Sequence, residues 1–120
     1  VKYTDLAYLI SVTKYDHILM MEMIALYLEQ TPVLMKMIKK SMQDEDWQSL
    51  HAAAHKMVPS FAIMGTNPAY EAMAKKVQSY TGTKNEASVI NDLIAQLETV
   101  CTTACEELKE EYTILKNTNA

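Results

Sequence analysis

Residues 44–65, with the sequence DEDWQSLHAAAHKMVPSFAIMG, decide the fold class of this chain. Acidic residues open the stretch, where the positive end of a helix dipole favours them, and a glycine closes it. Between these ends, apolar side chains recur at spacings of three and four residues, which is the helical period. They are Trp47, Leu50, Ala54, Met57 and Phe61. The stretch therefore predicts one amphipathic helix that ends near Gly65.

Two further helices are expected before this stretch. A short helix is predicted over residues 4–12, with Thr4 or Asp5 as its cap, and it should lie across one end of the protein. A long helix should begin after Asp16 and continue to about Met42. The expected core positions are Leu6, Leu9 and Ile10 in the short helix, and Met20, Ile24, Tyr27, Leu34, Met37 and Ile38 in the long one.

Proline and glycine residues mark where helices should bend, begin or end. Pro32 lies inside the long helix and should bend it, or divide it at Thr31. Asn67-Pro68 supplies a cap and a first-turn proline for a fourth helix, which Gly82 should stop. The fourth helix carries the apolar stripe Tyr70, Met73, Val77 and Tyr80.

A last helix is expected from about Glu86, and the composition agrees with an all-α chain. Its stripe is Val89, Leu93, Leu97, Val100, Ala104 and Leu108. With 120 residues, 49% hydrophobic content, 2 Gly and 3 Pro, the chain suits one helical domain. We expect residues 1–120 to form a single antiparallel four-helix bundle with a short accessory N-terminal helix, and residues 115–120 to form a frayed tail.

Charge and cysteine content narrow the classes of partner and compartment. The net charge is -4, and the lysine pairs at 39–40 and 75–76 are too short to follow a phosphate backbone, so nucleic acid is not an expected partner. Cys101 and Cys105 are interpreted as small reduced residues on one helix, which favours the cytoplasm. The apolar run from Ile18 to Leu28 is about half of a membrane span, so no membrane contact is expected.

His55 lies on the side of the third helix that faces away from the core. An advance of about 100° per residue places it well clear of the apolar stripe, and places His51 at the stripe's edge. The residues that share the face of His55 are Gln48, Ala52, Pro59 and Ala62, most of them small. Another protein could close over such an imidazole, which is a nucleophile when neutral.

The run from His51 to Gly65 resembles the phosphohistidine helix of histidine-containing phosphotransfer (HPt) domains. Alanine precedes His55, the small polar Ser60 follows it, and Gly65 stands ten residues after it. The segment Tyr27-Leu28-Glu29-Gln30 is similar to one on the family's neighbouring helix.

The resemblance implies a phosphorelay function in two-component signal transduction. His55 would accept a phosphoryl group on Nε2 from an aspartate of a response-regulator receiver domain and pass it to another receiver aspartate. Gln30 would hydrogen-bond the imidazole, and Ser60 and Gly65 would support the site. The expected docking surface comprises Gln48, His51, Ala52, Lys56, Pro59 and Ala62.

The resemblance also implies what the domain does not carry out by itself. It would have no kinase activity, no nucleotide site and no bound cofactor or metal, because the receiver supplies the Mg²⁺. A monomeric cytoplasmic module is expected, either free-standing or fused as the C-terminal module of a hybrid sensor histidine kinase, whose cytoplasmic part it would then form.

Two positions depart from the family pattern. Many HPt domains have a cation three residues after the histidine and a glycine one residue further, whereas this chain has Val58 and Pro59. The missing cation implies a phosphohistidine that is less stabilised by its own domain. Pro59 cannot donate a backbone hydrogen bond to the carbonyl of His55, so the helix should kink there.

Two alternatives to the phosphorelay remain open. One is a module that binds receiver-like partners through Ala52, Pro59 and Ala62 without being phosphorylated. The other is a metal-binding bundle, because both the His51/His55 pair and the Cys101/Cys105 pair have the i,i+4 spacing that can chelate Zn²⁺ or Cu²⁺.

Overall fold

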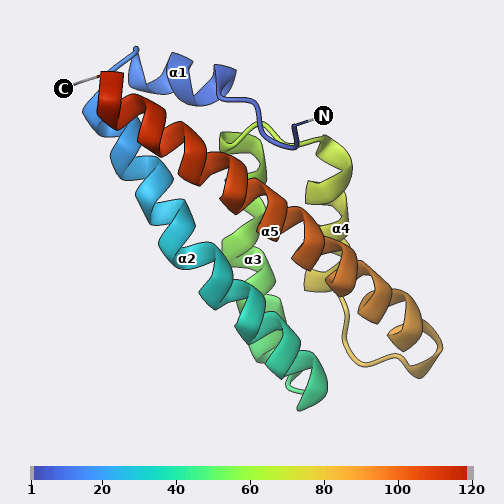
Figure 1. Cartoon of the computed structure of the whole chain (residues 1–120). Helices are drawn as coiled ribbons and strands as arrows, with labels where there is room; N and C mark the ends of the chain where they lie inside the picture. Colours follow the sequence, from blue (N-terminus) through green and yellow to red (C-terminus); the bar gives the residue numbers. More distant parts are fainter. Residues whose placement is uncertain (1, 119–120) are drawn as a thin grey trace.

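The computed structural model describes residues 2–118 and is all-helical over that range (Figure 1). A 3-10 turn, η1 (Lys84–Glu86), precedes the last helix. The α-helices are α1 (Ala7–Thr13), α2 (His17–Gln43), α3 (Trp47–Ile63), α4 (Pro68–Gln78) and α5 (Ala87–Thr118). The predicted helices are therefore all present, with boundaries that differ by a few residues.

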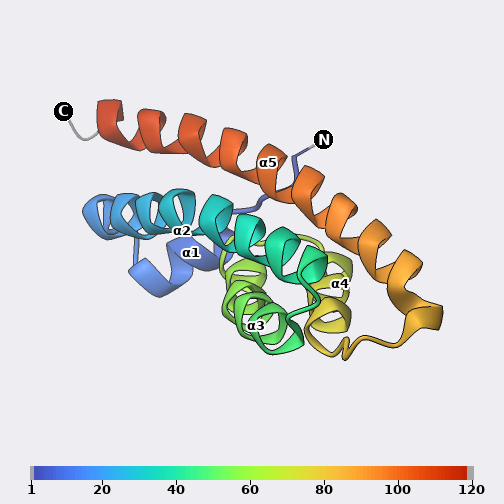
Figure 2. The ribbon, with the colours of Figure 1, turned by 90° about the horizontal axis from the view of Figure 1, so that it is seen from below.

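The helices α2 to α5 pack in a closed ring. Helix α2 contacts α3 and α5, and α4 contacts the same two helices from the opposite side. Figure 2 shows α5 lying lengthwise over α2 and α4, with α3 on the far side of the molecule. The short α1 contacts α2 and α3 and lies across one end, as predicted. Each helix of the ring thus has one covered face and one outward face.

The covered faces form a core in two parts. The larger part includes Leu50, Met57, Val77 and Leu97, which are at most 1% exposed. The smaller part lies under α1 and is built around Leu9, Ile24 and Leu108, all with no exposed surface. In α3 the predicted core positions Leu50, Ala54, Met57 and Phe61 are buried, so the outward direction of His55 follows from this stripe.

Polar residues cap the helices largely as expected. The side chains of Asp16, Asp46 and Asn67 accept hydrogen bonds from backbone amides in the first turns of α2, α3 and α4. The N-cap of α1 is Leu6, not Thr4 or Asp5, and it makes no side-chain cap bond; Asp5 Oδ1, one residue earlier, accepts from Ala7 N at 2.9 Å.

Pro32 does not divide α2, which is one helix from His17 to Gln43. The buried face around Pro32 also differs from the predicted one: Thr31 and Met35 are buried, Leu34 is half-buried and Met37 is 43% exposed. The physical reason is that Ile24, Tyr27, Thr31, Met35 and Ile38 follow each other at three or four residues. This register makes the polar Thr31 a core position.

Helix α5 shows a similar shift of register at its start and extends further than expected. Ile90 and Ile94 are buried, whereas Val89 is 44% exposed and Leu93 is half-buried. The helix continues to Thr118, and the fraying expected for residues 115–120 stays a prediction; the last two of these residues lie outside the described range.

Helix α2 is long and apolar enough to cross a membrane when judged by length and composition. In the 18-residue stretch of α2 that meets this criterion, 28% is buried inside the protein. Core helices of soluble proteins and N-terminal signal sequences meet the same criterion, so this finding is weak evidence. The absence of membrane contact stays a prediction.

Glu107 of α5 holds the N-terminal segment against the helices. Its carboxylate accepts hydrogen bonds from Tyr3 N at 2.8 Å, Thr4 N at 3.0 Å and Thr4 Oγ1 at 2.7 Å. Burial raises the pKa of Glu107, but the hydrogen bonds from Tyr3 and Thr4 outweigh it and hold the pKa below its usual value. The ionised carboxylate is therefore the form that the fold favours.

The Glu107→Gln variant should be less stable than the wild type at pH 7 by about 1–2 kcal/mol, because charge-assisted hydrogen bonds are lost. A pKa that is lowered on folding stabilises the protein above the unfolded-state pKa, and this contribution disappears as the pH falls through the folded-state pKa. Urea unfolding at pH 7 and pH 3 should therefore show a gap between the two proteins that narrows in acid. The exposed neighbour Glu106→Gln is the control, and an equal gap at both pH values would contradict the expectation.

Candidate functional site

His55 is exposed on the outer face of α3, as predicted, and His51 is exposed one turn before it. The two rings are parallel, with 6° between their planes and 6.0 Å between their centroids. Gln48, Ala52, Pro59 and Ala62 are all exposed too, so the expected open face exists. A flat partner surface can therefore reach the imidazole of His55.

Helix α4 supplies the contacts to both histidines through its last residue, Gln78. Gln78 Nε2 lies 3.2 Å from His55 Nδ1, and the backbone carbonyl of Gln78 accepts from His51 Nδ1 at 3.0 Å. One residue thus holds both imidazoles by their Nδ1 atoms. Among the described hydrogen bonds, neither Nε2 atom has a partner.

The contact with the backbone carbonyl defines the proton position on His51, whereas that on His55 depends on the orientation of the Gln78 amide. A carbonyl only accepts, so His51 carries a proton on Nδ1 and its neutral ring has a bare Nε2. The side-chain amide of Gln78 can present either end to His55, because its N and O ends have nearly the same shape. When Nε2 of Gln78 faces the ring, Nδ1 of His55 accepts and the ring proton is on Nε2 of His55. When Oε1 of Gln78 faces the ring, the proton is on Nδ1 of His55, and Nε2 of His55 is the nucleophile. The orientation of this amide therefore selects the nucleophilic nitrogen of His55.

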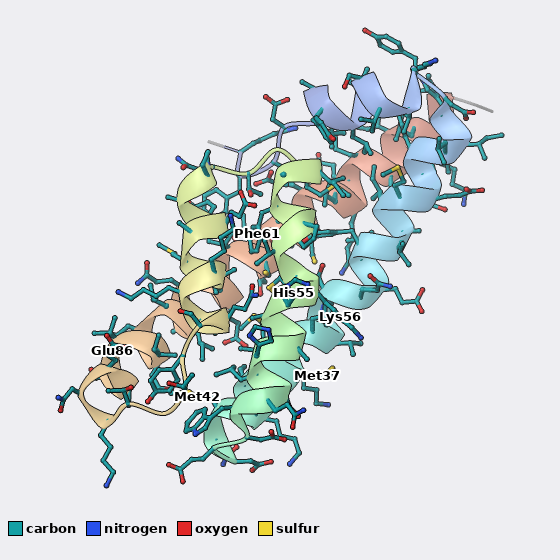
Figure 3. The ribbon with its side chains drawn as sticks, turned by 180° about the vertical axis from the view of Figure 1, so that it is seen from behind. Met37, Met42, His55, Lys56, Phe61 and Glu86 are labelled. Carbon is teal, nitrogen blue, oxygen red and sulfur yellow. The ribbon has the colours of Figure 1, made fainter. Side chains whose placement is uncertain are left out.

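The hydrogen bond that sequence analysis assigns to Gln30 is made by Gln78. Gln30 and Lys56 line the same hollow between α2 and α3, together with Leu34. Figure 3 shows Lys56 on the side of α3 nearer α2. The reason for the correction is geometric: α2 packs against the side of α3 that carries Lys56, whereas His55 faces α4.

The sequence contains no direct signal for the role of Gln78. The residue follows the core position Val77 directly and lies 23 positions after His55. Its role depends on the pairing of α3 with α4, which aligns the end of α4 with the middle of α3. A search for polar residues at the ends of helices next to α3 would have included it.

The described hydrogen bonds of Ser60 and Gly65 are with residues of α3 and its C-cap other than His55. Ser60 Oγ donates to Met57 O at 2.7 Å, and Ser60 lines the hollow on the α2 side. Gly65 follows the end of α3 with a φ of 68°, where Gly65 N donates to Ala62 O at 3.2 Å. Pro59 does not interrupt α3, which is one helix from Trp47 to Ile63.

The space between α3 and α4 beside His55 is an open depression of about 330 Å³. It is lined by His51, His55, Val58, Lys75, Gln78 and Ser79. Ser79 Oγ already donates to Lys76 O at 3.0 Å. The depression therefore places a second imidazole, one amide and one lysine next to the candidate nucleophile His55.

Metal-ligating residues are dispersed in the part of the chain that the structure describes. No group of three or more His, Cys, Asp or Glu residues there could hold a metal ion. Cys101 and Cys105 are free thiols that line a hollow against α2, whereas the histidine pair faces α4. Burial raises the pKa of Cys101 to about 12, which keeps this thiol protonated at neutral pH. The two pairs therefore do not form one metal site.

Replacement of Gln78 by leucine should change the tautomer of His55 and not that of His51. The hydrogen bond to His55 comes from the side chain of Gln78, so its loss should shift the tautomer ratio about three- to tenfold, to that of a free imidazole. His51 bonds the backbone carbonyl of residue 78, which leucine retains. Two-bond ¹H–¹⁵N spectra of the imidazoles measure both ratios, with His51 as the internal control. Unchanged spectra for His55 would show that Gln78 does not act on this ring.

Comparison of the chain with protein-family models, curated proteins and solved structures finds no match. The function is therefore argued from the fold and from the geometry around His55.

Proposed function

We propose that this chain is a phosphorelay intermediate of the HPt type, in which His55 Nε2 accepts a phosphoryl group from a receiver-domain aspartate and returns it to another receiver aspartate. The observation that carries this proposal is the exposed imidazole on a face of small side chains, held at Nδ1 by Gln78. This arrangement leaves Nε2 as the ring atom that an incoming phosphoryl group can reach.

The transfer follows from the chemistry of the two groups. His55 Nε2 attacks the phosphorus of the aspartyl phosphate in line, the N–P bond forms, and the P–O bond to the aspartate breaks to release a carboxylate. Transfer requires Oε1 of the Gln78 amide toward Nδ1, the reverse of the orientation in the structure, where the amide Nε2 faces this ring atom. Nδ1 then keeps its proton and donates it in a hydrogen bond. The positive charge that develops on the ring is thereby stabilised. Attack by a second aspartate reverses the step.

The helix packing supports a four-helix bundle as the fold of this chain. The closed ring of α2, α3, α4 and α5 is compatible with an antiparallel four-helix bundle, with α1 as the accessory helix at one end. In such a fold the receiver would dock on Gln48, His51, Ala52, Lys56, Pro59 and Ala62. All six are exposed. The receiver would bring Mg²⁺ and its acidic residues, and this chain would act as a cytoplasmic monomer without kinase activity.

A second candidate function is binding of receiver-like partners without phosphorylation. Val58 is half-buried and lines the depression beside His55, in the position where many HPt domains have a cation. A domain that had lost phosphotransfer could keep the open face and still bind. Binding with no transfer would favour this candidate.

The test is transfer from phosphorylated, labelled receiver domains in the presence of Mg²⁺. We expect label on this chain within minutes, and the label should be labile in acid and stable in alkali, as for phosphohistidine. A receiver whose acceptor aspartate is replaced by asparagine provides the control and should transfer nothing. Absence of label from every member of a panel of receivers would overturn the proposal.

A further inference from the structure

We propose that Lys75 of α4 supplies the cation that binds the phosphoryl group on His55, in place of the cation that α3 lacks at Val58. The inference rests on the proposed function and names a residue of the same site. It starts from the depression between α3 and α4, which Lys75 lines together with His55 and Val58. Of the six residues that line this depression, Lys75 alone carries a permanent charge.

The position of Lys75 follows from that of Gln78. The two residues are three positions apart on α4, so they share one face of the helix. Gln78 is the residue whose amide lies 3.2 Å from His55 Nδ1. Lys75 therefore stands one turn before this contact, on the side of α4 that meets α3.

The ammonium group of Lys75 is free to move toward a new anion. Its side chain is 62% exposed, and its ion pair with Glu71 is loose, with 3.8 Å between Nζ and Oε1. An exposed pair of this kind contributes little to stability. The flexible four-carbon stem of lysine lets the ammonium group follow a phosphate as a point charge.

The other lysines near the site are less well placed. Lys56 follows His55 in the sequence but lies on the α2 side of α3, in the hollow that also contains Gln30 (Figure 3). Lys76 is exposed on α4, and the depression is lined without it. Lys75 is thus the lysine that lies on the side of α4 facing α3 and lines the same depression as His55.

The electrostatics of α4 give such a cation a specific task. The helix ends at Gln78, whose backbone carbonyl contacts His51, so the negative end of the helix dipole lies beside the depression that His55 lines. A phosphoryl group with about two negative charges would be repelled there. A lysine in the last turn reduces this repulsion, because its positive charge attracts both the helix carbonyls and the phosphoryl group.

The experiment phosphorylates the protein with phosphoramidate, which needs no receiver. His55 Nε2 attacks the phosphorus, the N–P bond forms on the ring, and the P–N bond of the reagent breaks to release ammonia. ³¹P NMR then follows the pH titration of the phosphoryl group, and its signal is assigned to His55 by its loss in His55→Gln. The compared proteins are the wild type, Lys75→Gln, Lys75→Arg and the matched control Lys76→Gln.

A nearby cation favours the more negative form of the phosphoryl group and lowers its titration midpoint. In Lys75→Gln we expect the midpoint to rise by about half a pH unit, which is about a threefold change in proton affinity. Lys75→Arg and Lys76→Gln should titrate like the wild type. A lysine that only stabilises the end of α4 would leave the midpoint unchanged, so identical midpoints for Lys75→Gln and Lys76→Gln would overturn the inference.

The outcomes separate this inference from the function on which it rests. If phosphoramidate labels His55 but no receiver does, the phosphorelay proposal fails, while the titration still decides the role of Lys75. If receivers transfer label and the midpoint does not depend on Lys75, the phosphorelay stands and the inference falls. If phosphoramidate gives no phosphohistidine at His55, the depression does not accept a phosphoryl group and the inference also falls.

Discussion

The His55→Gln variant should accept no label from a phosphorylated receiver, under conditions in which the wild type is labelled within minutes. Glutamine has no ring nitrogen to attack phosphorus, so the loss should be complete rather than partial. The fold should be unaffected, because His55 is exposed and its polar contact is a single hydrogen bond to Gln78. We expect the free energy of unfolding to change by less than about 0.5 kcal/mol.

The matched control is His51→Gln, which removes the neighbouring parallel imidazole from the same exposed face. His51 anchors the end of α4 through the carbonyl of Gln78, so its loss should slow transfer by less than about tenfold while label still accumulates. Gel autoradiography after acid and alkali treatment measures both variants. Label that persists in His55→Gln, or disappears in His51→Gln, would mean that the acceptor has been assigned to the wrong histidine.

The Gly65→Ala variant should lose about 2–3 kcal/mol of stability. Gly65 has a φ of 68°, a left-handed conformation that costs a residue with a Cβ about 1–2 kcal/mol. The added Cβ would also collide with the backbone carbonyl oxygen of Asp5. Relief of this collision would displace the segment before α1, whose Asp5 N donates to Met64 O at 3.0 Å.

Urea unfolding of Gly65→Ala and Gly65→Asn separates the two causes. Asparagine adopts the left-handed conformation more readily than alanine but carries the same Cβ, so its loss of stability should be smaller and still clear. Equal stability of Gly65→Ala and the wild type would show that neither the backbone conformation nor the contact with Asp5 matters. The result would also test whether Gly65 serves the fold rather than the surroundings of His55.

The local features of the fold could be predicted from sequence because they depend on neighbouring residues. Asp16, Asp46 and Asn67 cap helices where their positions suggest it. The apolar spacing in residues 47–61 identifies the buried face of α3 and hence the outward face that carries His55. A helical period and a cap are properties of a few consecutive residues, so no tertiary information is needed.

The predictions that failed concern which side of a helix meets which neighbour. Gln30 and Gln78 both lie on helices next to α3, but α2 covers the side of Lys56 and α4 covers the side of His55. Met37 and Val89 are apolar and more than 40% exposed, while the polar Thr31 is buried. Such assignments depend on the rotation of each helix about its axis, which is determined by the packing of all its neighbours.

The sequence by itself determined an all-helical chain with five helices and an exposed histidine on the third one, because helical periodicity and caps are encoded within each segment. The tertiary structure alone decided that Gln78 contacts His55 Nδ1 and that Lys75 shares its depression. These residues are 23 and 20 positions from His55, as the printed numbering shows. They meet because α4 packs along α3, and this pairing results from burial of both apolar stripes in one core.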